Sequence, residues 1–331
     1  MNYTTLNHSD IRISTLALGC FAFAGGQTWG DQDEQDTVRT IECALEHGIT
    51  FFDTAEGYGA GYSEEVLGRV LAGKRDQVVI ATKVSPQNLR PSDLEAACVA
   101  SLERLQTDYI DLYQIHWPNH DVPLAESVGK LEELKAKGMI RTIGISNFGE
   151  RDFGELLELS TPVINQLPYN LLFRVIEHDI IPLAEKHKVG ILPYSPIMQG
   201  LLTGKFTSAD DVPEGRARTR HFTGSRPKAQ HGEAGFEAET FQAIRQLDEL
   251  ATRMGVALTH LALAWVLHQT PVTAVLVGAR TIEQLEHNIQ AANLKLPTDV
   301  LQELDAITAP LKEGLGTNPD MWNNVQNSRY R

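Results

Sequence analysis

Short runs of apolar residues alternate with amphipathic segments along almost the whole chain. The runs are rich in β-branched residues, and several are nearly continuous in apolar character, as parallel strands covered on both faces are. We predict strands at residues 13–19, 49–55, 77–84, 109–116, 141–146, 163–169, 189–195 and 273–279. Apolar residues spaced by three and four positions predict helices between them, for example at 37–48, 91–105, 124–138, 175–190, 237–254 and 256–269.

This alternation predicts the fold class. Eight strands alternating with helices, with no linker between them, fit an α/β fold in which residues 1–331 form a single (β/α)8 (TIM) barrel domain. Residues 3–14 are predicted to form an N-terminal β-hairpin that closes the floor of the barrel. A polar, basic loop at 205–235 follows the seventh strand, and a loop of that length is typically functional or mobile.

The composition narrows the classes of partner. The 331 residues carry a formal net charge of −14, which argues against nucleic acid or an anionic membrane as the main partner. The cysteines Cys20, Cys43 and Cys98 form no C-x-x-C pair and fit reduced thiols in a cytoplasmic protein. No apolar run approaches the ~20 residues of a spanning helix, and we expect neither a signal peptide nor a metal. The pattern does not indicate an oligomeric state.

Two glycine-rich stretches look like nucleotide-binding loops without completing either motif. Gly57, Gly59 and Gly61 do not form G-x-G-x-x-G, because Glu64 stands at the last position. The run GLLTGK at 200–205 lacks both the first glycine and the final Ser/Thr of a P-loop. We therefore expect these glycines to shape turns.

Polar side chains stand where the predicted strands end, which is where barrel enzymes carry their catalytic groups. Lys83 lies at the end of an apolar run and needs a carboxylate, and Asp53 ends the neighbouring strand. Tyr58 follows Asp53 closely, and a nearby ammonium lowers the pKa of a phenol from its usual ~10. Such a phenol can exchange a proton near neutral pH, and His116, on the next strand end, can donate a hydrogen bond to a substrate oxygen. A purely structural ion pair between Asp53 and Lys83 is the alternative.

Several segments together, in this order and at strand ends, resemble the aldo-keto reductase superfamily. They are DTAEGYG (53–59), TK (82–83), QIHW (114–117), IGISNF (143–148), NQLPYN (165–170), PYSPIMQGLLTGK (193–205) and VGARTIEQLEHN (277–288). The chain is similar to the bacterial and potassium-channel β-subunit-like branches. The resemblance implies a catalytic tetrad of Asp53, Tyr58, Lys83 and His116. Tyr58 would be the general acid in carbonyl reduction, with its pKa lowered by Lys83.

The resemblance also implies an NADPH (NADP+) cofactor, bound in extended form without a Rossmann domain. The nicotinamide would be held by Ser146, Asn147, Gln166 and Tyr194. The pyrophosphate would be surrounded by Ser195, Gly200, Leu201, Gly204 and Lys205, with the long loop and its Arg218 above them. The adenosine would be met by Gly278, Arg280, Gln284 and Asn288, with Arg280 at the 2′-phosphate. Gln284 also fits a capping box with Thr281, which is a structural alternative.

The chain departs from the family pattern at two points. Arg216 replaces an acid in the loop motif that reads PEGRAR here, while Arg218 keeps the matching arginine. His287 replaces a carboxylate in the adenosine segment. Less negative charge near the 2′-phosphate favours NADPH over NADH. The sequence indicates no role for Glu56.

The expected substrate is a small aldehyde, ketone or sugar-type carbonyl compound. Its pocket would be lined, beside the tetrad, by Phe23, Trp29 and Trp117. The C-terminal tail has no clear periodicity, so Met321 and Trp322 could either cover an opening or lie on the surface. One alternative function is an NADPH-binding regulatory subunit with little turnover. Another is a barrel aldolase with Lys83 as Schiff-base nucleophile.

Overall fold

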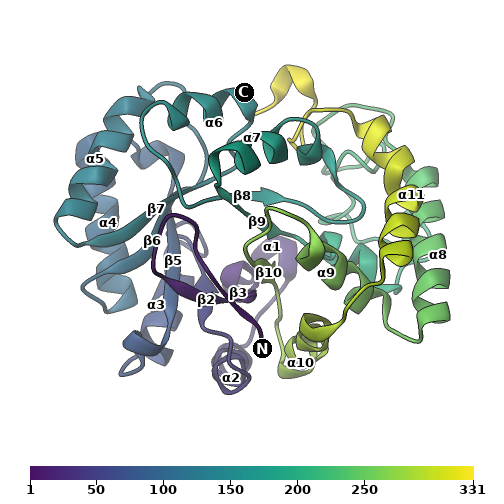
Figure 1. The fold of residues 1–331 in the computed structure, drawn as a ribbon, viewed down its shortest axis with the longest axis horizontal. Helices are drawn as coiled ribbons and strands as arrows, with labels where there is room; N and C mark the ends of the chain where they lie inside the picture. The colour runs from purple at the N-terminus through teal and green to yellow at the C-terminus, as the bar shows by residue number, and fades with distance from the viewer.

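The computed structural model describes the backbone of residues 1–331 and every side chain except those of Gln27 and Thr28. A short hairpin, β1 (Tyr3–Thr5) and β2 (Arg12–Ser14), precedes an eight-stranded parallel sheet with helices around it (Figure 1). The sheet strands are β3 (Leu16–Gly19), β4 (Phe51–Asp53), β5 (Val79–Val84), β6 (Ile110–Ile115), β7 (Ile140–Ser146), β8 (Ile164–Pro168), β9 (Gly190–Tyr194) and β10 (Val275–Val277).

The sheet closes on itself. The strand order runs β10-β3-β4-β5-β6-β7-β8-β9, and β9 meets the residues before β10 through backbone bonds. Ile191 donates to the Pro271 carbonyl at 3.0 Å and accepts from Thr273 at 2.9 Å. The TIM-barrel prediction is confirmed, and each predicted strand is present; all are shorter than predicted except β7, which begins one residue earlier. Residues 13–14 belong to the hairpin instead, and the first barrel strand begins at Leu16.

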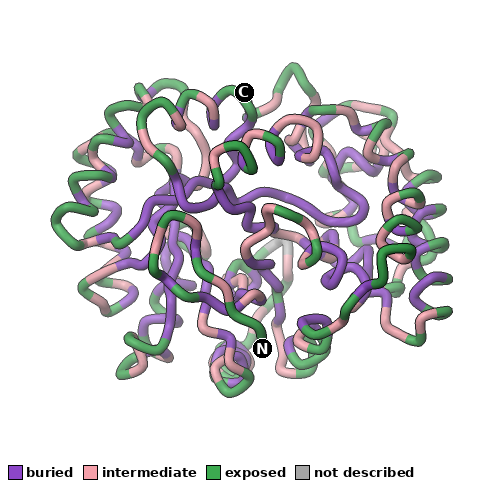
Figure 2. The backbone as a smooth tube through the Cα atoms, viewed as in Figure 1, coloured by how far each residue is buried: buried purple, intermediate pink, exposed green. Residues whose placement is uncertain are grey.

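The core has two parts, because parallel strands bury both faces. Figure 2 shows this as continuous purple strands surrounded by helices whose outer sides are green. One apolar cluster fills the space between strands and helices. A second lies inside the barrel and includes Leu6, Ile11 and Ile13 of the hairpin, together with Phe51 and Leu192 of the strands. The hairpin therefore plugs the floor, as predicted, and leaves the opposite end of the barrel for a site.

The helical layer follows the strands in order. Its helices are α1 (Gly26–Trp29), α2 (Glu34–Glu46), α3 (Tyr62–Val70), α4 (Pro91–Leu105), α5 (Leu124–Ala136), α6 (Glu150–Leu157), α7 (Ile180–His187), α8 (Glu237–Met254), α9 (Leu258–His268), α10 (Ile282–Ile289) and α11 (Thr298–Leu315). α8 and α11 pack side by side at one edge of the molecule (Figure 1). No single helix of the described chain is long and apolar enough to cross a membrane; α8 and α9 pass that test only as a pair bent by 95°.

One predicted helix differs from the structure. Residues 175–190 form a 3-10 turn (Val175–Glu177) and then α7, rather than one helix. Pro182 explains the break, because it has no N–H to continue a helical ladder and is tolerated only near a helix start. The predicted loop at 205–235 is present: it follows the 3-10 turn Met198–Thr203, contains the short 3-10 turn Ala209–Asp211 and is otherwise irregular up to α8.

Candidate active site

The strands bring Asp53, Lys83 and Tyr58 together at the open end of the barrel. Asp53 is the last residue of β4, and Lys83 lies near the end of the adjacent β5. The Lys83 ammonium donates to Asp53 Oδ1 at 2.6 Å, to the Thr54 carbonyl at 2.7 Å and to the Tyr58 hydroxyl at 3.2 Å. The side chain of Lys83 is fully buried and that of Asp53 nearly so. The predicted pair and its link to Tyr58 are therefore both present in the structure.

Lys83 carries a positive charge in this buried position. Burial lowers its pKa, but the Asp53 carboxylate and the Tyr58 phenol more than offset that effect, and the net pKa is raised. A charged ammonium is a donor that cannot act as a nucleophile. This argues against the aldolase alternative, since a Schiff-base lysine needs a lowered pKa.

The pKa of Tyr58 differs from the sequence-based expectation. Burial raises it above its usual value, although the Lys83 ammonium acts in the opposite direction. Burial outweighs the effect of Lys83 on the phenol pKa, and the Asp53 carboxylate, which is paired with Lys83, adds to the rise. Tyr58 is therefore protonated at neutral pH, which is the state that a general acid requires.

His116 completes the predicted tetrad one residue beyond β6. Its ring meets that of Tyr58 edge to face, with centroids 5.7 Å apart. Burial lowers the pKa of His116 to about 3, and the Lys83 charge acts in the same direction. The imidazole is thus neutral at physiological pH and offers one N–H for a hydrogen bond. It adds no second positive charge beside the Lys83 ammonium.

Gln114 is a site residue that the sequence did not single out. Its amide donates to Asp53 Oδ2 at 3.0 Å, and that of Gln166 donates to the same oxygen at 2.8 Å. Both glutamines are buried and lie on barrel strands. One amide N–H of Gln166 is therefore bonded to Asp53 of the tetrad, a contact that was not predicted in addition to the expected nicotinamide contact. An uncharged polar residue near the carboxyl end of β6, close to His116, was the available signal.

Glu56 has a structural role. Its Oε1 accepts a hydrogen bond from the Ser85 backbone at 2.6 Å and one from the Asn88 amide at 2.9 Å. These bonds tie the loop after β4 to the loop after β5. Glu56 therefore fixes the turn that carries Tyr58, rather than contributing a charge to the chemistry.

The aromatic cluster at the expected substrate pocket contains Phe21 in place of Phe23. Phe23 is 1 % exposed and belongs to the core, so the expectation that it lines the pocket is wrong. Phe21 lies 4.8 Å from the Tyr58 ring and 6.0 Å from that of Trp29, and it is 41 % exposed. The segment Cys20–Ala24 is a 3-10 helix, in which residues two apart point in different directions. Sequence periodicity alone could not assign this short turn.

The loop after β9 has an unusual backbone. Ser195, Met198 and Gln199 all have positive φ, between 47° and 52°, and Gly200 and Gly204 follow at 95° and 75°. Side chains other than glycine adopt this region at a cost, and such residues cluster at functional sites. Asn170 holds the loop by donating to the Ser195 carbonyl at 3.0 Å. Leu201, expected at the pyrophosphate, is buried in the core beneath the loop.

Cations gather above this loop. A Cβ atom on Gly200 would lie 3.3 Å from the Lys205 ammonium and 3.6 Å from the Arg216 guanidinium. Burial lowers the pKa of Lys205, Arg216 and Arg218, and repulsion from neighbouring arginines adds to each shift. In the described part of the chain, none of these three pairs with a carboxylate, whereas Arg220 and Arg226 pair with Glu233 and Glu237.

These residues fit an anionic group such as a dinucleotide pyrophosphate. Arg218 Nε is buried and has no hydrogen-bond partner among the described atoms. An unpartnered buried donor is costly unless a ligand satisfies it. Positive charges that repel one another are likewise stabilised by a bound anion. The donor set therefore matches the cofactor site that the sequence indicated, with Arg216 as an added member.

The expected adenosine end is a cavity of about 590 Å³ between α10 and the loop before α2, lined by Asp31, Gln32, Asp33, Asp36, Arg280, Thr281 and Gln284. Arg280 holds that loop, donating to the Trp29 carbonyl at 2.5 Å, to Gln32 Oε1 at 2.7 Å and to the Asp31 carbonyl. Its guanidinium thus acts as a latch, meaning that it bonds the loop at residues 29–32 to the start of α10, a role that the sequence did not indicate.

The other residues expected at the adenosine, Gln284 and Asn288, also make hydrogen bonds within the protein. Gln284 accepts from the Arg280 backbone at 2.9 Å, and its own backbone donates to the Thr281 hydroxyl at 3.4 Å. In a capping box the Gln284 side chain would accept from the backbone N–H of Thr281, the N-cap. Here it accepts from Arg280, one residue earlier. The amide of Asn288 donates to the Gly278 carbonyl at 3.3 Å. These contacts keep α10 fixed against the end of β10.

Ser146, Asn147 and Tyr194 form one hydrogen-bonded group beside the tetrad. Asn147 has a left-handed backbone with φ of 63°, and its amide donates to the Ser146 hydroxyl and to the His116 carbonyl, each at 3.0 Å. The Tyr194 hydroxyl donates to Asn147 Oδ1 at 2.9 Å. Three of the four residues expected at the nicotinamide are therefore brought together, from the ends of β7 and β9.

The C-terminal tail covers one side of this opening. Trp322 stacks toward Tyr194 with ring centroids 6.5 Å apart, and Met321 is buried. Tyr330 packs edge to face against Trp117 at 5.3 Å, and the Arg329 guanidinium lies 3.8 Å from the centre of the same indole. The sequence left open whether the tail covers an opening or lies on the surface, and the structure favours the first.

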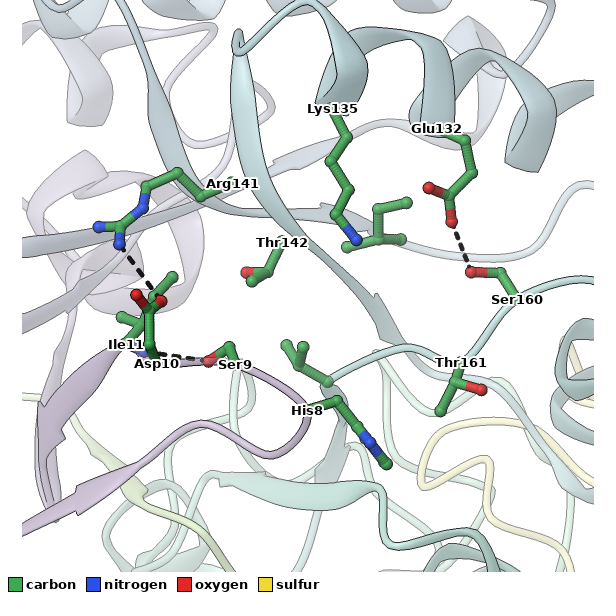
Figure 3. Close-up of a pocket in the computed structure, with 12 residues that line it drawn as sticks. His8, Ser9, Asp10, Ile11, Glu132, Lys135, Arg141, Thr142, Ser160 and Thr161 are labelled. Atoms are coloured by element: carbon green, nitrogen blue, oxygen red, sulfur yellow. Dashed lines mark hydrogen bonds and ion pairs between the residues drawn. The ribbon is translucent and has the colours of Figure 1, made fainter.

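A second cavity, of about 290 Å³, lies at the other end of the barrel (Figure 3). It is lined by hairpin-turn residues and by Arg141 and Thr142, which stand at the start of β7. Among its charged groups, Arg141 pairs with Asp111 and Asp10, and Glu132 accepts from the Ser160 hydroxyl. It contains no tetrad member, and barrel active sites lie at the carboxyl ends of the strands. We therefore take the tetrad end of the barrel as the candidate active site.

Comparisons with known proteins agree with this geometry. The Aldo/keto reductase family model matches residues 15–309. The chain is 36 % identical to aldo-keto reductase YhdN of Bacillus subtilis, over 93 % of each chain. It is 35 % identical to the NADH-specific methylglyoxal reductase of Escherichia coli, over 89 % of this chain and 95 % of that protein. An aldo-keto reductase of Klebsiella pneumoniae, solved in complex with NADPH, superimposes with a TM-score of 0.72 at 27 % identity, covering 93 % of this chain and 96 % of that one. The chain belongs to the aldo/keto reductase family of NAD(P)H-dependent oxidoreductases.

Proposed function

We propose that this protein reduces the carbonyl group of a small aldehyde, ketone or sugar-type substrate with NADPH, and that Tyr58 is the general acid. The observation that carries the proposal is the buried chain Asp53–Lys83–Tyr58, with bonds of 2.6 and 3.2 Å. Tyr58 stands at its outer end, beside His116 and the aromatic pocket. A nicotinamide dinucleotide supplies a hydride when it is bound.

The residues of the chain provide the proton and the orientation. The protonated Tyr58 hydroxyl transfers its proton to the carbonyl oxygen, which becomes the product hydroxyl. The neutral His116 donates a hydrogen bond to the same oxygen and holds it near Tyr58. Lys83 stabilises the phenolate that remains after the transfer, and Asp53 keeps Lys83 in place. In the reverse direction the phenolate accepts the proton of an alcohol.

Charge supports NADPH as the reductant. Lys205, Arg216 and Arg218 line the expected phosphate path, and Arg216 lies close enough to Arg280 for their charges to repel. Asp33 and Asp36 border the adenosine cavity, but both are committed elsewhere: Asp33 caps α2, and Asp36 pairs with Arg39. A 2′-phosphate there would meet Arg280 and the nearby Arg216, and of the three bordering aspartates only Asp31 is given neither role. The Escherichia coli relative is named as NADH-specific, so the two dinucleotides must be compared directly.

A steady-state substrate panel tests the proposal. 4-Nitrobenzaldehyde, methylglyoxal and an aldose are each offered with NADPH and, separately, with NADH. We expect turnover of at least one carbonyl compound and a higher kcat/KM with NADPH. Tight NADPH binding without turnover of any compound would instead support the regulatory-subunit alternative. Equal or better use of NADH would refute the argument from Arg216 and Arg280.

A further inference from the structure

The side-chain amide of Asn147 has no hydrogen-bonding capacity left. Its Nδ2 donates to the His116 carbonyl and to Ser146 Oγ, each at 3.0 Å. Its Oδ1 accepts from the Tyr194 hydroxyl at 2.9 Å and from the Tyr330 hydroxyl at 2.7 Å. An amide offers two N–H donors and two oxygen lone pairs, so all positions are filled. The amide cannot be turned over, because the His116 carbonyl only accepts. A new partner at Asn147 must therefore displace an existing one.

One of the four partners differs from the others in its attachment. His116, Ser146 and Tyr194 stand at the ends of barrel strands, where backbone ladders fix them. Tyr330 belongs to the tail that follows α11, which lies outside the barrel. It is the partner that can leave without disturbing a strand.

Specific contacts dock the tail at this place. The Arg331 carbonyl accepts from the backbone of Arg151 at 2.9 Å and of Asp152 at 3.2 Å, in the first turn of α6. The Arg331 backbone N–H donates to Asp152 Oδ2 at 3.1 Å. Gly149 makes this approach possible, because a Cβ atom there would overlap the Arg331 carbonyl. Figure 1 shows the end of the chain beside α6.

A second anchor lies further back in the tail. The buried Asp320 accepts from both Arg329 Nε at 2.9 Å and Arg329 Nη2 at 2.8 Å. This pair holds Arg329 over Trp117 and places the next residue, Tyr330, at Asn147. The position of the Tyr330 hydroxyl at Asn147 is thus fixed by the Asp320–Arg329 ion pair and by the packing of Arg329 on Trp117.

We propose that Tyr330 is a displaceable cap on Asn147, which occupies the amide oxygen that the nicotinamide carboxamide needs and must leave it when the cofactor binds. The inference rests on the proposed function, because it takes Asn147 as a carboxamide contact. A carboxamide NH2 needs an acceptor, and Asn147 Oδ1 can supply one only after losing a tyrosine hydroxyl. The tail therefore lowers the affinity of the enzyme for the nicotinamide half of the cofactor.

Tyr330→Phe tests this directly, since it removes one oxygen and keeps the ring against Trp117. NADPH is titrated into the purified full chain by fluorescence, and 2′,5′-ADP, which lacks the nicotinamide half, is titrated by calorimetry. Loss of one competing hydrogen bond predicts that the Kd for NADPH falls about threefold to tenfold. The Kd for 2′,5′-ADP stays unchanged. An unchanged or weaker affinity for NADPH would overturn the inference, as would equal tightening for both ligands.

Two further variants separate the cap from general effects on the tail. Gly149→Ala adds the Cβ that overlaps Arg331, so the tail lifts while Tyr330 remains, and NADPH affinity should rise as in Tyr330→Phe. Tyr3→Phe removes a hydroxyl that bonds the Gly48 carbonyl in the hairpin region, and it should change neither Kd. Failure of Gly149→Ala to tighten NADPH would also contradict the cap. If the wild-type protein bound neither ligand, the proposed function itself would fall; if it bound both and Tyr330→Phe changed nothing, only the cap would.

Discussion

Replacing Lys83 by methionine should destabilise the fold as well as abolish turnover. The ammonium lies 2.6 Å from Asp53, and the two residues are 0 % and 2 % exposed. Methionine has a similar length and no charge, so the variant leaves the Asp53 carboxylate buried with only the amides of Gln114 and Gln166 as partners. Breaking a buried ion pair from one side costs about 3–5 kcal/mol.

That free energy corresponds to a measurable shift in the thermal midpoint. A chain of 331 residues has an unfolding entropy of roughly 0.7 kcal/mol per kelvin, so the loss lowers the midpoint by about 4–7 °C. Circular dichroism during heating measures the midpoint, and 4-nitrobenzaldehyde reduction measures the activity.

The double variant Asp53→Asn, Lys83→Met separates stability from chemistry. It leaves no buried charge, so it should be more stable than Lys83→Met while remaining inactive. An unchanged thermal midpoint in Lys83→Met would refute the ion-pair reasoning. A double variant whose loss equals the sum of both single losses would refute it as well.

Two further predictions follow from the charges around the site. His116 has a folded pKa of about 3 against 6.5 for the free side chain, so kcat/KM should show no inflection near pH 6.5. Stability should fall as pH drops from 6.5 toward about 3, because only unfolded His116 takes up a proton there; an inflection near 6.5 that disappears in His116→Asn would contradict the neutral imidazole. Arg218→Ala should weaken NADPH binding about tenfold to a hundredfold, as loss of a charged hydrogen bond does. The thermal midpoint should change little, since Arg218 Nε has no hydrogen-bond partner among the described atoms and the guanidinium has only a distant contact with the Trp322 ring, at 5.8 Å. The control Arg253→Ala removes an exposed arginine paired with Glu303 and should leave the Kd unchanged, and a cofactor affinity unaffected by Arg218→Ala would remove that residue from the site.

Much of the fold and the tetrad could be predicted from sequence because the signals are regular. Apolar strands that alternate with amphipathic helices specify a barrel, and polar residues at strand ends must then converge at one mouth. Asp53, Lys83 and His116 meet for that reason, since neighbouring parallel strands place their ends side by side. The latch role of Arg280 could not be predicted, because it joins residues 29–32 to a position about 250 residues away.

Other features depend on three-dimensional context that no periodic pattern carries. Phe21 and Phe23 lie in a short 3-10 turn, and which of them faces the pocket depends on packing against Tyr58. The pKa of Tyr58 is set mainly by burial, which raises it more than the Lys83 ammonium lowers it, and Asp53 raises it further. The tail residues follow no repeat, and their position becomes clear only from the contacts of Arg331 with α6.

Tyr58→Phe tests the central claim most directly. The substitution removes the proposed proton donor and keeps the ring that packs against Phe21 and His116. NADPH Kd is measured by fluorescence, and kcat is measured with the best carbonyl compound from the panel. We expect kcat to fall by about a factor of 10² to 10⁴, the usual contribution of a positioned acid, while the Kd for NADPH stays within a small factor of that of the wild type. A variant that retains full turnover with normal cofactor affinity would show that Tyr58 is not the acid.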